Sequence, residues 1–352
     1  MVAATLLPLR GAPRATPPVL DIAASAVSYH PAFPGEEMSI ALVFPGQGSQ
    51  AVGMGRALAA SFAVARQVFD EVDAALGDKL SALMWEGPAE TLTLTENAQP
   101  ALLAVSLAAL RVLETEVGFA VQREAAYVAG HSLGEYSALA AAGSLSPAAA
   151  ARLVRIRGRA MQQAVPVGVG AMAALLGLEF DAAAAVAAEA AQGQVCQAAN
   201  DNGGGQVVVS GDKAAVERAV EIAKARGARR AMMLTVSAPF HCALMQPAAD
   251  AMAQALAITE VRAPAVPVVA NVLARPVTEP GEIVRCLIAQ VTGTVRWRES
   301  VTFMAQAGVT TFYEVGAGKV LSGLVKRIAD GAAGVAVGTP EDIAAVKAAR
   351  AT

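Results

Sequence analysis

The sequence is poor in cysteine, in aromatic residues and in charge. Its three cysteines, Cys196, Cys242 and Cys286, are too widely spaced for a disulfide framework, and no ligand spacing joins them to the three histidines, so we expect neither disulfides nor a bound metal. Aromatic residues make up 4% of the chain and charged residues 16%, and the net charge of −3 leaves no basic footprint for nucleic acid. No uninterrupted apolar run reaches the ~18 residues that cross a bilayer. These absences argue against nucleic-acid and membrane partners and favour a reducing, cytoplasmic setting.

The chain is rich in hydrophobic residues, which make up 55% of its 352 residues, and alanine is the most frequent of them. That length suits one large domain or two, with a core large enough for an enzyme, and we expect a monomer. The first 37 residues differ, because they hold six prolines and no sustained periodicity. We therefore predict a disordered N-terminal extension over 1–37. Met38 precedes a clean strand pattern and is a candidate start of natural translation.

The most informative segment is Gly-His-Ser-Leu-Gly at 130–134, which follows an apolar run over 125–129 and precedes an alanine-rich helical pattern. Strand, sharp turn and helix with Ser132 at the apex form the context of a nucleophile elbow. The two glycines permit a tight turn, and the helix that follows directs free N–H groups toward negative charge developing at the serine. A glycine-punctuated turn without chemistry is the alternative, and the flanking elements favour a nucleophile.

A serine nucleophile needs a base, and the chain has three histidines to supply it. His131 is adjacent to Ser132 in the elbow, so its side chain should project away from the hydroxyl. His30 lies in the predicted extension. His241 remains, at the end of a strand pattern and after a proline turn, and is the candidate base. Cys242 beside it is interpreted as a small buried hydrophobic residue.

The patterns along the chain predict an α/β fold. A strand over 39–44 runs into a glycine-rich loop, and helical patterns follow over 55–80 and over 98–116, the second with Pro100 in its first turn. Ser146 is the expected N-cap of the next helix. We predict a large catalytic domain from 38–165 and 238–345, with a mainly parallel sheet, flanking helices and an α/β-hydrolase-like core. A C-terminal tail follows over 346–352.

Between 166 and 237 the pattern changes to strand, helix, strand, strand, helix, strand, which predicts a small inserted ferredoxin-like subdomain. The Asn- and Gly-rich loop at 200–205 is interpreted as a turn and not as a phosphate cradle, because a strand follows it. The Gly-Ala-Gly-Lys turn at 316–319 is assigned a packing role, since two glycines alone are a weak nucleotide signal.

Five separated motifs, in this order, resemble the malonyl-CoA:acyl carrier protein transacylases of fatty-acid synthesis, which are related to polyketide-synthase acyltransferase domains. The resemblance covers roughly residues 39–345. The motifs are Phe-Pro-Gly-Gln-Gly-Ser-Gln at 44–50, the elbow at 130–136, Arg-Gly-Arg-Ala-Met-Gln at 157–162, Phe-His-Cys-Ala-Leu-Met at 240–245 and Tyr-Glu-Val-Gly-Ala-Gly-Lys-Val-Leu at 313–321.

The resemblance implies a mechanism for the elbow serine. Ser132 would attack the thioester of malonyl-CoA, with His241 taking its proton and returning it to the leaving thiolate. The backbone N–H groups of Gln47 and Leu133 would form the oxyanion hole. The backbone carbonyl of Gln290 would orient the histidine in place of an aspartate. Transfer would be ping-pong, through a malonyl-serine intermediate, and no bound cofactor is implied.

The resemblance also implies how the substrates are recognised. Arg157 would pair with the free malonyl carboxylate through two parallel hydrogen bonds, and Gln99 would line the pocket. The bulky Phe240, together with Leu133, resembles malonyl-selective relatives and disfavours a methyl branch. The second substrate would be acyl carrier protein, which is acidic. Arg229–Arg230 is the candidate docking cluster, with a merely solubilising surface as the equal alternative.

Two other functions compete with this interpretation. A serine hydrolase or thioesterase of the α/β-hydrolase type shares the elbow, but its histidine comes late in the chain, whereas over a hundred residues follow His241 here. In such a hydrolase Arg157 would also place a charge in an otherwise apolar acyl pocket, which makes sense only if the substrate bears a carboxylate. A non-catalytic scaffold that binds carrier protein is the third possibility, and the joint presence of Ser132, His241 and Arg157 argues against it.

Overall fold

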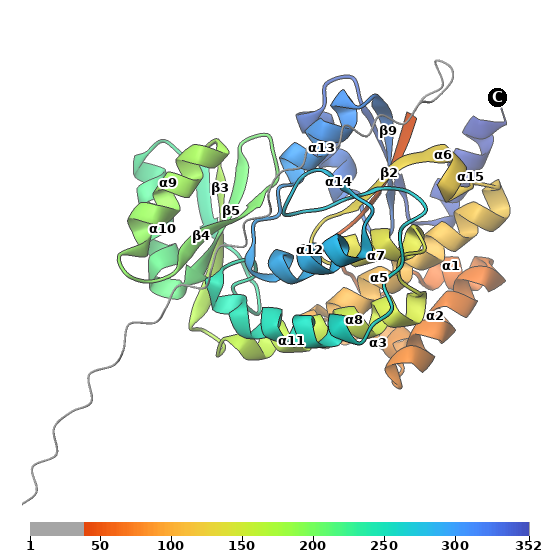
Figure 1. Ribbon diagram of the computed structural model, residues 1–352, viewed down its shortest axis with the longest axis horizontal. Helices are drawn as coiled ribbons and strands as arrows, with labels where there is room; N and C mark the ends of the chain where they lie inside the picture. Colours follow the sequence, from red (N-terminus) through yellow and green to blue (C-terminus); the bar gives the residue numbers. More distant parts are fainter. Residues whose placement is uncertain (1–38, 352) are drawn as a thin grey trace, which may run out of the picture. The chain divides into compact units, whose positions relative to one another are not determined.

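The computed structural model describes residues 39–351. The predicted N-terminal extension, Met38 and Thr352 lie outside that range. Six strands form the larger sheet, in the order β10-β9-β1-β2-β7-β8, and all neighbours pair in parallel except β7 and β8, which are antiparallel. Figure 1 labels β2 and β9 of this sheet. The strands are β1 (Ser39–Phe44), β2 (Ala125–Gly130), β7 (Val268–Val269), β8 (Pro276–Val277), β9 (Val309–Val315) and β10 (Ala333–Val337).

Helices cover the larger sheet on both faces, which is why its central strands are apolar throughout rather than alternating. None of the helices among residues 39–351 is long and apolar enough to cross a membrane. The helices outside the smaller sheet are α1 (Arg56–Ser61), α2 (Ala63–Leu76), α3 (Leu80–Glu86), α4 (Ala89–Thr93), α5 (Thr95–Val112), the π-helix η1 (Leu113–Val117), α6 (Val121–Glu124), α7 (Gly134–Ala141), α8 (Pro147–Ala164), the 3-10 helix η2 (Ala243–Met245), α11 (Gln246–Ala257), α12 (Pro280–Thr292), α13 (Trp297–Gln306), α14 (Val320–Ile328) and α15 (Pro340–Arg350).

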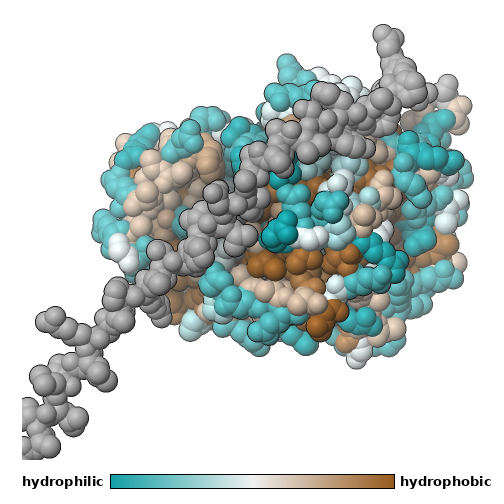
Figure 2. All heavy atoms as spheres, in the orientation of Figure 1, coloured by the Kyte–Doolittle hydropathy of each residue, from teal (hydrophilic) through white to brown (hydrophobic). Residues whose placement is uncertain are grey.

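Successive residues of β1 point to opposite faces of the sheet and enter two different cores. Ala41 and Val43 pack with α13 and α14, around Trp297. Leu42 and Phe44 enter the larger core on the other face, which α2, α5, α8, α11 and α12 build. On the face of the molecule drawn in Figure 2, hydrophobic residues gather toward the middle and hydrophilic residues dominate the edges.

Two helical predictions differ from the structure. The stretch over 55–80 is not one helix, because the chain becomes extended at Phe62 between α1 and α2. The helix expected over 98–116 begins earlier, at Thr95, so Pro100 lies inside α5 and not in its first turn. Asn97 misled the prediction: its side chain, typical of a cap, donates to the carbonyl of Thr91 instead. The expected N-cap Ser146 does accept a hydrogen bond from the N–H of Ala149.

The smaller sheet contains β3 (Gly170–Leu176), β4 (Cys196–Asp201), β5 (Gln206–Asp212) and β6 (Arg230–Met233), in the antiparallel order β4-β5-β3-β6. Helices α9 (Phe180–Ala191) and α10 (Lys213–Ala225) supply the apolar residues that pack on one face of it (Figure 1). The order of these six elements is the one the sequence predicted, and the division of the chain into domains stays a prediction. The β6 strand ends at Met233, three residues before the predicted end.

Parallel pairing brings two loops to one edge of the larger sheet. Phe44 at the end of β1 is the register partner of Gly130 at the end of β2, so the loop over 45–50 and the elbow leave the sheet side by side. A Cβ on Gly134 would collide with the carbonyl oxygen of Phe44, and one on Gly46 would lie 2.7 Å from the carbonyl oxygen of His131. Glycine is therefore required at both positions for the two loops to approach each other.

Candidate active site

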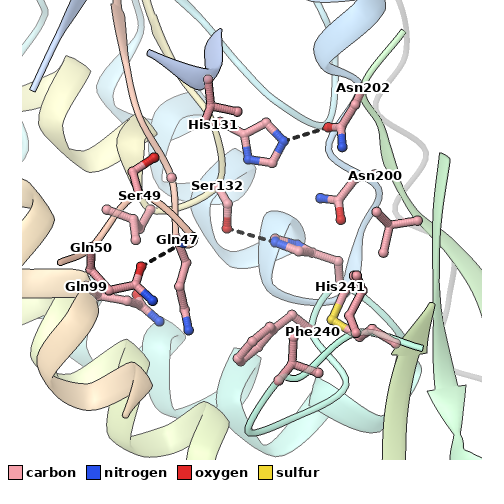
Figure 3. Close-up of a pocket in the computed structure, with 18 of the residues that line it drawn as sticks. Gln47, Ser49, Gln50, Gln99, His131, Ser132, Asn200, Asn202, Phe240 and His241 are labelled. Atoms are coloured by element: carbon pink, nitrogen blue, oxygen red, sulfur yellow. Dashed lines mark hydrogen bonds between the residues drawn. The ribbon is translucent and has the colours of Figure 1, made fainter. Parts of the chain in front are cut away.

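A cavity of about 730 Å³ lies beside the elbow, and both sheets contribute residues to its walls (Figure 3). The larger sheet supplies the loop after β1 and the elbow after β2. The smaller sheet supplies residues from β3, β4 and β5, and the segment over 234–237 that follows β6 completes that wall. Ser132, His241, Arg157, Gln99 and Phe240, which the sequence singled out, all line this one cavity.

The elbow holds Ser132 in a strained backbone conformation, with φ at 53°, which few residues other than glycine adopt. Asn271, two residues after the end of β7, stabilises that turn through its side chain. Its side-chain oxygen accepts a hydrogen bond from the Ser132 N–H at 2.8 Å, and its side-chain nitrogen donates to the Gly130 carbonyl at 2.7 Å. Asn271 therefore fixes the backbone that leads from β2 into the serine.

His241 lies within hydrogen-bond distance of the serine, as Figure 3 shows. Its Nε2 is 2.8 Å from the Ser132 hydroxyl, and its Nδ1 is 2.8 Å from the backbone carbonyl oxygen of Gln290. Burial, reinforced by the charge of Arg157, lowers the pKa of His241 to about 3. The ring is therefore neutral near pH 7, with Nδ1–H donating to the Gln290 carbonyl and Nε2 free to accept the serine proton.

Arg157, on α8, is a buried cation whose hydrogen-bond partners are all uncharged. Its side chain is almost completely buried. It donates to Gln99 Oε1 at 2.8 Å, to the Ser132 hydroxyl at 3.0 Å and to Gln290 Oε1 at 2.8 Å, while its Nε–H has no partner among the described residues. No carboxylate of residues 39–351 lies within ion-pair distance, and burial lowers the Arg157 pKa. A buried guanidinium without a counter-ion, next to a nucleophile, favours an anionic ligand.

Two backbone N–H groups beside the cavity are candidates for an oxyanion hole. Gln47, in the loop after β1, and Leu133, directly before α7, both line the cavity, and neither backbone N–H donates a hydrogen bond to another described residue. The Gln47 side chain is fixed by the hydroxyl of Thr95, which donates to it at 3.0 Å. The same hydroxyl accepts from Gln99 Nε2 at 2.9 Å. A hydrogen-bond chain thus connects the loop after β1 to Arg157.

The sequence missed several residues of the cavity wall. Asn200 and Asn202, at the end of β4, line the cavity although the sequence placed them in a simple turn. His131 points away from the serine hydroxyl, and its Nε2–H donates to Asn202 Oδ1 at 2.9 Å (Figure 3). This bond joins the elbow to the smaller sheet. The sequence signal for Asn200 and Asn202 is a pair of asparagines directly after an apolar strand pattern.

Other residues singled out in the sequence lie away from the cavity. Arg229 and Arg230 are exposed, at the start of β6, and do not line it. Cys242 is completely buried, and burial raises the pKa of its thiol, which donates to the Pro239 carbonyl at 3.2 Å. Among residues 39–351, no cluster of three or more histidine, cysteine, aspartate or glutamate side chains could hold a metal ion.

Comparison with known proteins shows the family to which the chain belongs. The sequence pattern of the acyl transferase domain matches residues 41–340. The chain belongs to the acyl transferase family. The malonyl CoA-acyl carrier protein transacylase of Escherichia coli is 51% identical to this acyl transferase over 305 residues, which cover 87% of the chain and 97% of the relative. That of Bacillus subtilis is 48% identical, over 86% of the chain and 95% of the relative.

Solved structures agree with this assignment. An acyl-carrier-protein-S-malonyltransferase from Bartonella henselae is 54% identical and superposes with a TM-score of 0.87, covering 90% of this acyl transferase and all of that chain. A malonyl-transacylase solved in complex with its type II PKS acyl-carrier protein is 45% identical, with a TM-score of 0.85 over 88% of this chain and 99% of that one.

Proposed function

We propose that this acyl transferase moves a malonyl group from malonyl-CoA to the phosphopantetheine thiol of acyl carrier protein, through a malonyl-serine intermediate. The observation that carries the proposal is Arg157, a buried cation that touches the nucleophile and has no ion-pair partner among residues 39–351. A substrate with a thioester at one end and a free carboxylate at the other satisfies both groups at once. The names of the relatives, which are malonyl transacylases, support the same substrate.

The first half-reaction acylates the serine. His241 Nε2 takes the hydroxyl proton while Ser132 Oγ attacks the thioester carbonyl carbon, and the negative charge develops on the carbonyl oxygen. The N–H groups of Gln47 and Leu133 stabilise that oxyanion. The C–S bond then breaks, and the CoA thiolate leaves with the proton that His241 held. The Gln290 carbonyl keeps the imidazole in the required tautomer.

The second half-reaction reverses these steps with a new thiol. His241 takes the proton of the phosphopantetheine thiol, the sulfur attacks the malonyl-serine ester, and Ser132 Oγ leaves with that proton. An uncharged orienting group for the histidine is sufficient, because a thiolate leaves far more readily than an amine. Both substrates use the same cavity in turn, which is the structural basis for ping-pong kinetics.

The carboxylate end of the malonyl group binds Arg157. The planar guanidinium presents two parallel N–H groups to a carboxylate, and Gln99 Oε1 holds its other edge in place at 2.8 Å. Phe240, next to the histidine, is a bulky side chain that lines the cavity, and we expect it to disfavour a methyl branch on the acyl group. Discrimination against one added methyl group amounts to about 1–3 kcal/mol, so we expect a preference for malonyl over methylmalonyl and not an absolute selection.

A transfer assay separates this function from a hydrolase or a scaffold. The purified chain is given malonyl-CoA together with holo acyl carrier protein, and both malonyl-carrier protein and free malonate are measured. We expect transfer to exceed hydrolysis greatly, and Ser132→Ala to abolish transfer. Release of malonate at the rate of CoA release would instead establish a hydrolase, and carrier-protein binding without turnover would establish a scaffold.

For carrier-protein docking we propose the Arg229–Arg230 cluster. Lys224 and Arg226, nearby, are already paired with Glu221 and Glu189, whereas no ion pair occupies Arg229 or Arg230 among the described residues. Two exposed, unpaired cations suit an acidic partner. Reversing both charges to glutamate should raise the KM for carrier protein about tenfold at low salt and leave the KM for malonyl-CoA much less affected. An unchanged KM for carrier protein would contradict the assignment.

A further inference from the structure

Glu135 is a buried carboxylate beside the nucleophile that the proposed reaction does not use. It lies in the first turn of α7, three residues after Ser132, and is only 2% exposed. It does not line the cavity. Its Oε2 accepts a hydrogen bond from the backbone N–H of Asn271 at 3.0 Å and another from Gln290 Nε2 at 2.9 Å. Burying a carboxylate costs free energy, so a buried acidic side chain beside the nucleophile calls for a structural or functional explanation.

The Gln290 side chain connects Glu135 to the cation of the site. Its Nε2 donates to Glu135 and to the Ser132 carbonyl at 3.0 Å, while its Oε1 accepts from Arg157 Nη2 at 2.8 Å. A carboxylate oxygen offers only acceptor capacity, so Glu135 determines which end of the amide faces it. The opposite end, the oxygen, is then turned toward Arg157. Reversing the amide would present N–H groups to the guanidinium.

The charge of Glu135 also matters to Arg157. Burial raises the pKa of Glu135 to about 7, while its hydrogen bonds and the Arg157 charge oppose that rise. In turn Glu135 raises the pKa of Arg157 against the effect of burial. Both bonds that Glu135 accepts end on the same oxygen, Oε2, so the acceptor function persists if the other oxygen carries a proton. No described carboxylate contacts the guanidinium directly, and its described hydrogen-bond partners, Gln99, Ser132 and Gln290, are all uncharged.

We propose that Glu135 is a positioning residue for substrate selection: through the Gln290 side-chain amide, it holds the Arg157 guanidinium in the orientation that accepts the free carboxylate of the acyl group. This proposal rests on the proposed function, since it concerns how the same site chooses its acyl group. The backbone N–H of Glu135 donates to the Ser132 carbonyl, but among the described residues its side chain hydrogen-bonds only Asn271 and Gln290 and does not contact the Ser132 hydroxyl. Its effect is therefore expected on acyl selectivity and not on the reactivity of the serine.

A purely architectural role for Glu135 is the competing explanation, since it also accepts the Asn271 N–H, and Asn271 stabilises the elbow. The two explanations differ in what they change. Loss of elbow geometry would slow every reaction of Ser132. Loss of Arg157 orientation would slow only reactions whose substrate carries a carboxylate, because an uncharged acyl group makes no use of the guanidinium.

The test is Glu135→Gln, which keeps the shape of the side chain and removes its charge and its fixed acceptor character. Three quantities are measured: kcat and KM with malonyl-CoA, the same with acetyl-CoA, and the rate at which phenylmethylsulfonyl fluoride, an uncharged reagent, inactivates the serine. We expect kcat/KM for malonyl-CoA to fall about tenfold, mainly through KM, as for a weakened hydrogen bond to a charged group. Acetyl-CoA kinetics and inactivation should change by no more than about twofold.

A matched control is Glu314→Gln. Glu314 is also completely buried and accepts two backbone N–H groups, those of Leu321 and Ser322 at the start of α14. This variant should lower the melting temperature and leave the malonyl-to-acetyl ratio unchanged. Equal losses of malonyl transfer and of serine inactivation in Glu135→Gln would overturn the proposal, as would an unchanged malonyl-to-acetyl ratio.

A double-mutant cycle tests the route through Gln290. Gln290→Leu removes the amide and keeps the backbone carbonyl that holds His241. If Glu135 acts through this amide, the malonyl selectivity of the double variant should equal that of Gln290→Leu alone; additive losses would contradict the proposal. A wild-type enzyme without preference for malonyl-CoA over acetyl-CoA would refute the proposed function itself, which distinguishes that failure from failure of this inference.

Discussion

At the scale of single residues, the site consists of a neutral base and a cation that no described carboxylate pairs with, both within hydrogen-bond distance of one hydroxyl. His241 accepts from Ser132 at Nε2, and Arg157 donates to the same oxygen at 3.0 Å. The charge of Arg157 is one cause of the low His241 pKa. The residue that selects the substrate therefore also helps to keep the base unprotonated, which couples specificity to reactivity within one small volume.

Arg157→Ala should convert a malonyl-selective enzyme into an unselective one. Removing the fork of hydrogen-bond donors should lower kcat/KM for malonyl-CoA by about 100-fold or more, while kcat/KM for acetyl-CoA should stay level or rise. The comparison is made by steady-state kinetics with both thioesters. Arg157→Lys serves as the control, because lysine keeps the charge and loses the fork, and it should recover only part of the selectivity. The same ratio of kcat/KM for malonyl-CoA to kcat/KM for acetyl-CoA in wild type and in Arg157→Ala would contradict this role.

The low pKa of His241 predicts an unusual pH dependence. An unperturbed histidine loses half its basic form at pH 6.5, whereas burial lowers the pKa of this one to about 3. The rate of serine inactivation by an uncharged sulfonyl fluoride should therefore stay nearly constant as the pH falls from about 8 to about 5. The sign follows because a lowered pKa keeps the ring neutral into acid. A rate that halves near pH 6.5 would show that the ring protonates normally.

At the scale of elements, the site exists because two strand ends meet. The parallel register of β1 and β2 sets the glycine-rich loop against the elbow, and the close approach requires glycine at 46 and at 134. Helix α7 starts within this contact, and the first N–H groups of the helix donate to carbonyls of the elbow itself, which closes the turn around the serine. The packing of backbone against backbone, more than any single hydrogen bond, determines where Ser132 lies.

Gly134→Ala tests this close packing. Its Cβ would collide with the Phe44 carbonyl, so the elbow must move, and we expect a loss of about 2–3 kcal/mol in unfolding free energy together with an activity loss of about 100-fold or more. Denaturant unfolding and transfer kinetics measure the two effects. Gly323→Ala, in the exposed face of α14 with open space around the new methyl, should instead stabilise by about 0.5–1 kcal/mol and keep full activity. Similar behaviour of the two variants would contradict the packing account.

Sequence patterns were most informative where residue type and local structure coincide. The elbow, the N-cap Ser146 and the six elements of the smaller sheet follow from apolar periodicity and from glycine and serine at defined offsets. The predicted start of α5 is wrong, because the side chain of Asn97 bonds the Thr91 carbonyl and, from α8, Arg155, and the second partner is one that no local pattern reveals. The α/β-hydrolase-like description of the larger sheet stays a prediction.

The polar network of the site could be predicted only in part. The resemblance named Gln290 for its carbonyl, but its amide meets Glu135 and Arg157 only because α7, α8 and α12 pack together, and sequence spacing carries no information on that packing. Asn202 likewise meets His131 across two sheets, 71 positions along the chain. Pairings at such separations depend on tertiary structure.

At the scale of the whole molecule, the cavity lies where the larger and the smaller sheet both contribute walls. Asp201 at the end of β4 donates its N–H to the Val295 carbonyl at 2.9 Å, and the His131–Asn202 bond adds a second link beside the nucleophile. The elbow after β2 supplies the serine, α8 supplies the cation, and the segment between β6 and η2 supplies the base. The smaller sheet supplies the opposite wall, against which a thioester chain can lie.

The most direct test of the central claim is intact-protein mass spectrometry after brief incubation with malonyl-CoA alone, followed by peptide mapping. The account predicts one added malonyl group, located on Ser132, absent from Ser132→Ala, strongly reduced in His241→Ala and removed by holo acyl carrier protein. A malonyl group on any other residue, or an undiminished adduct in Ser132→Ala, would contradict it.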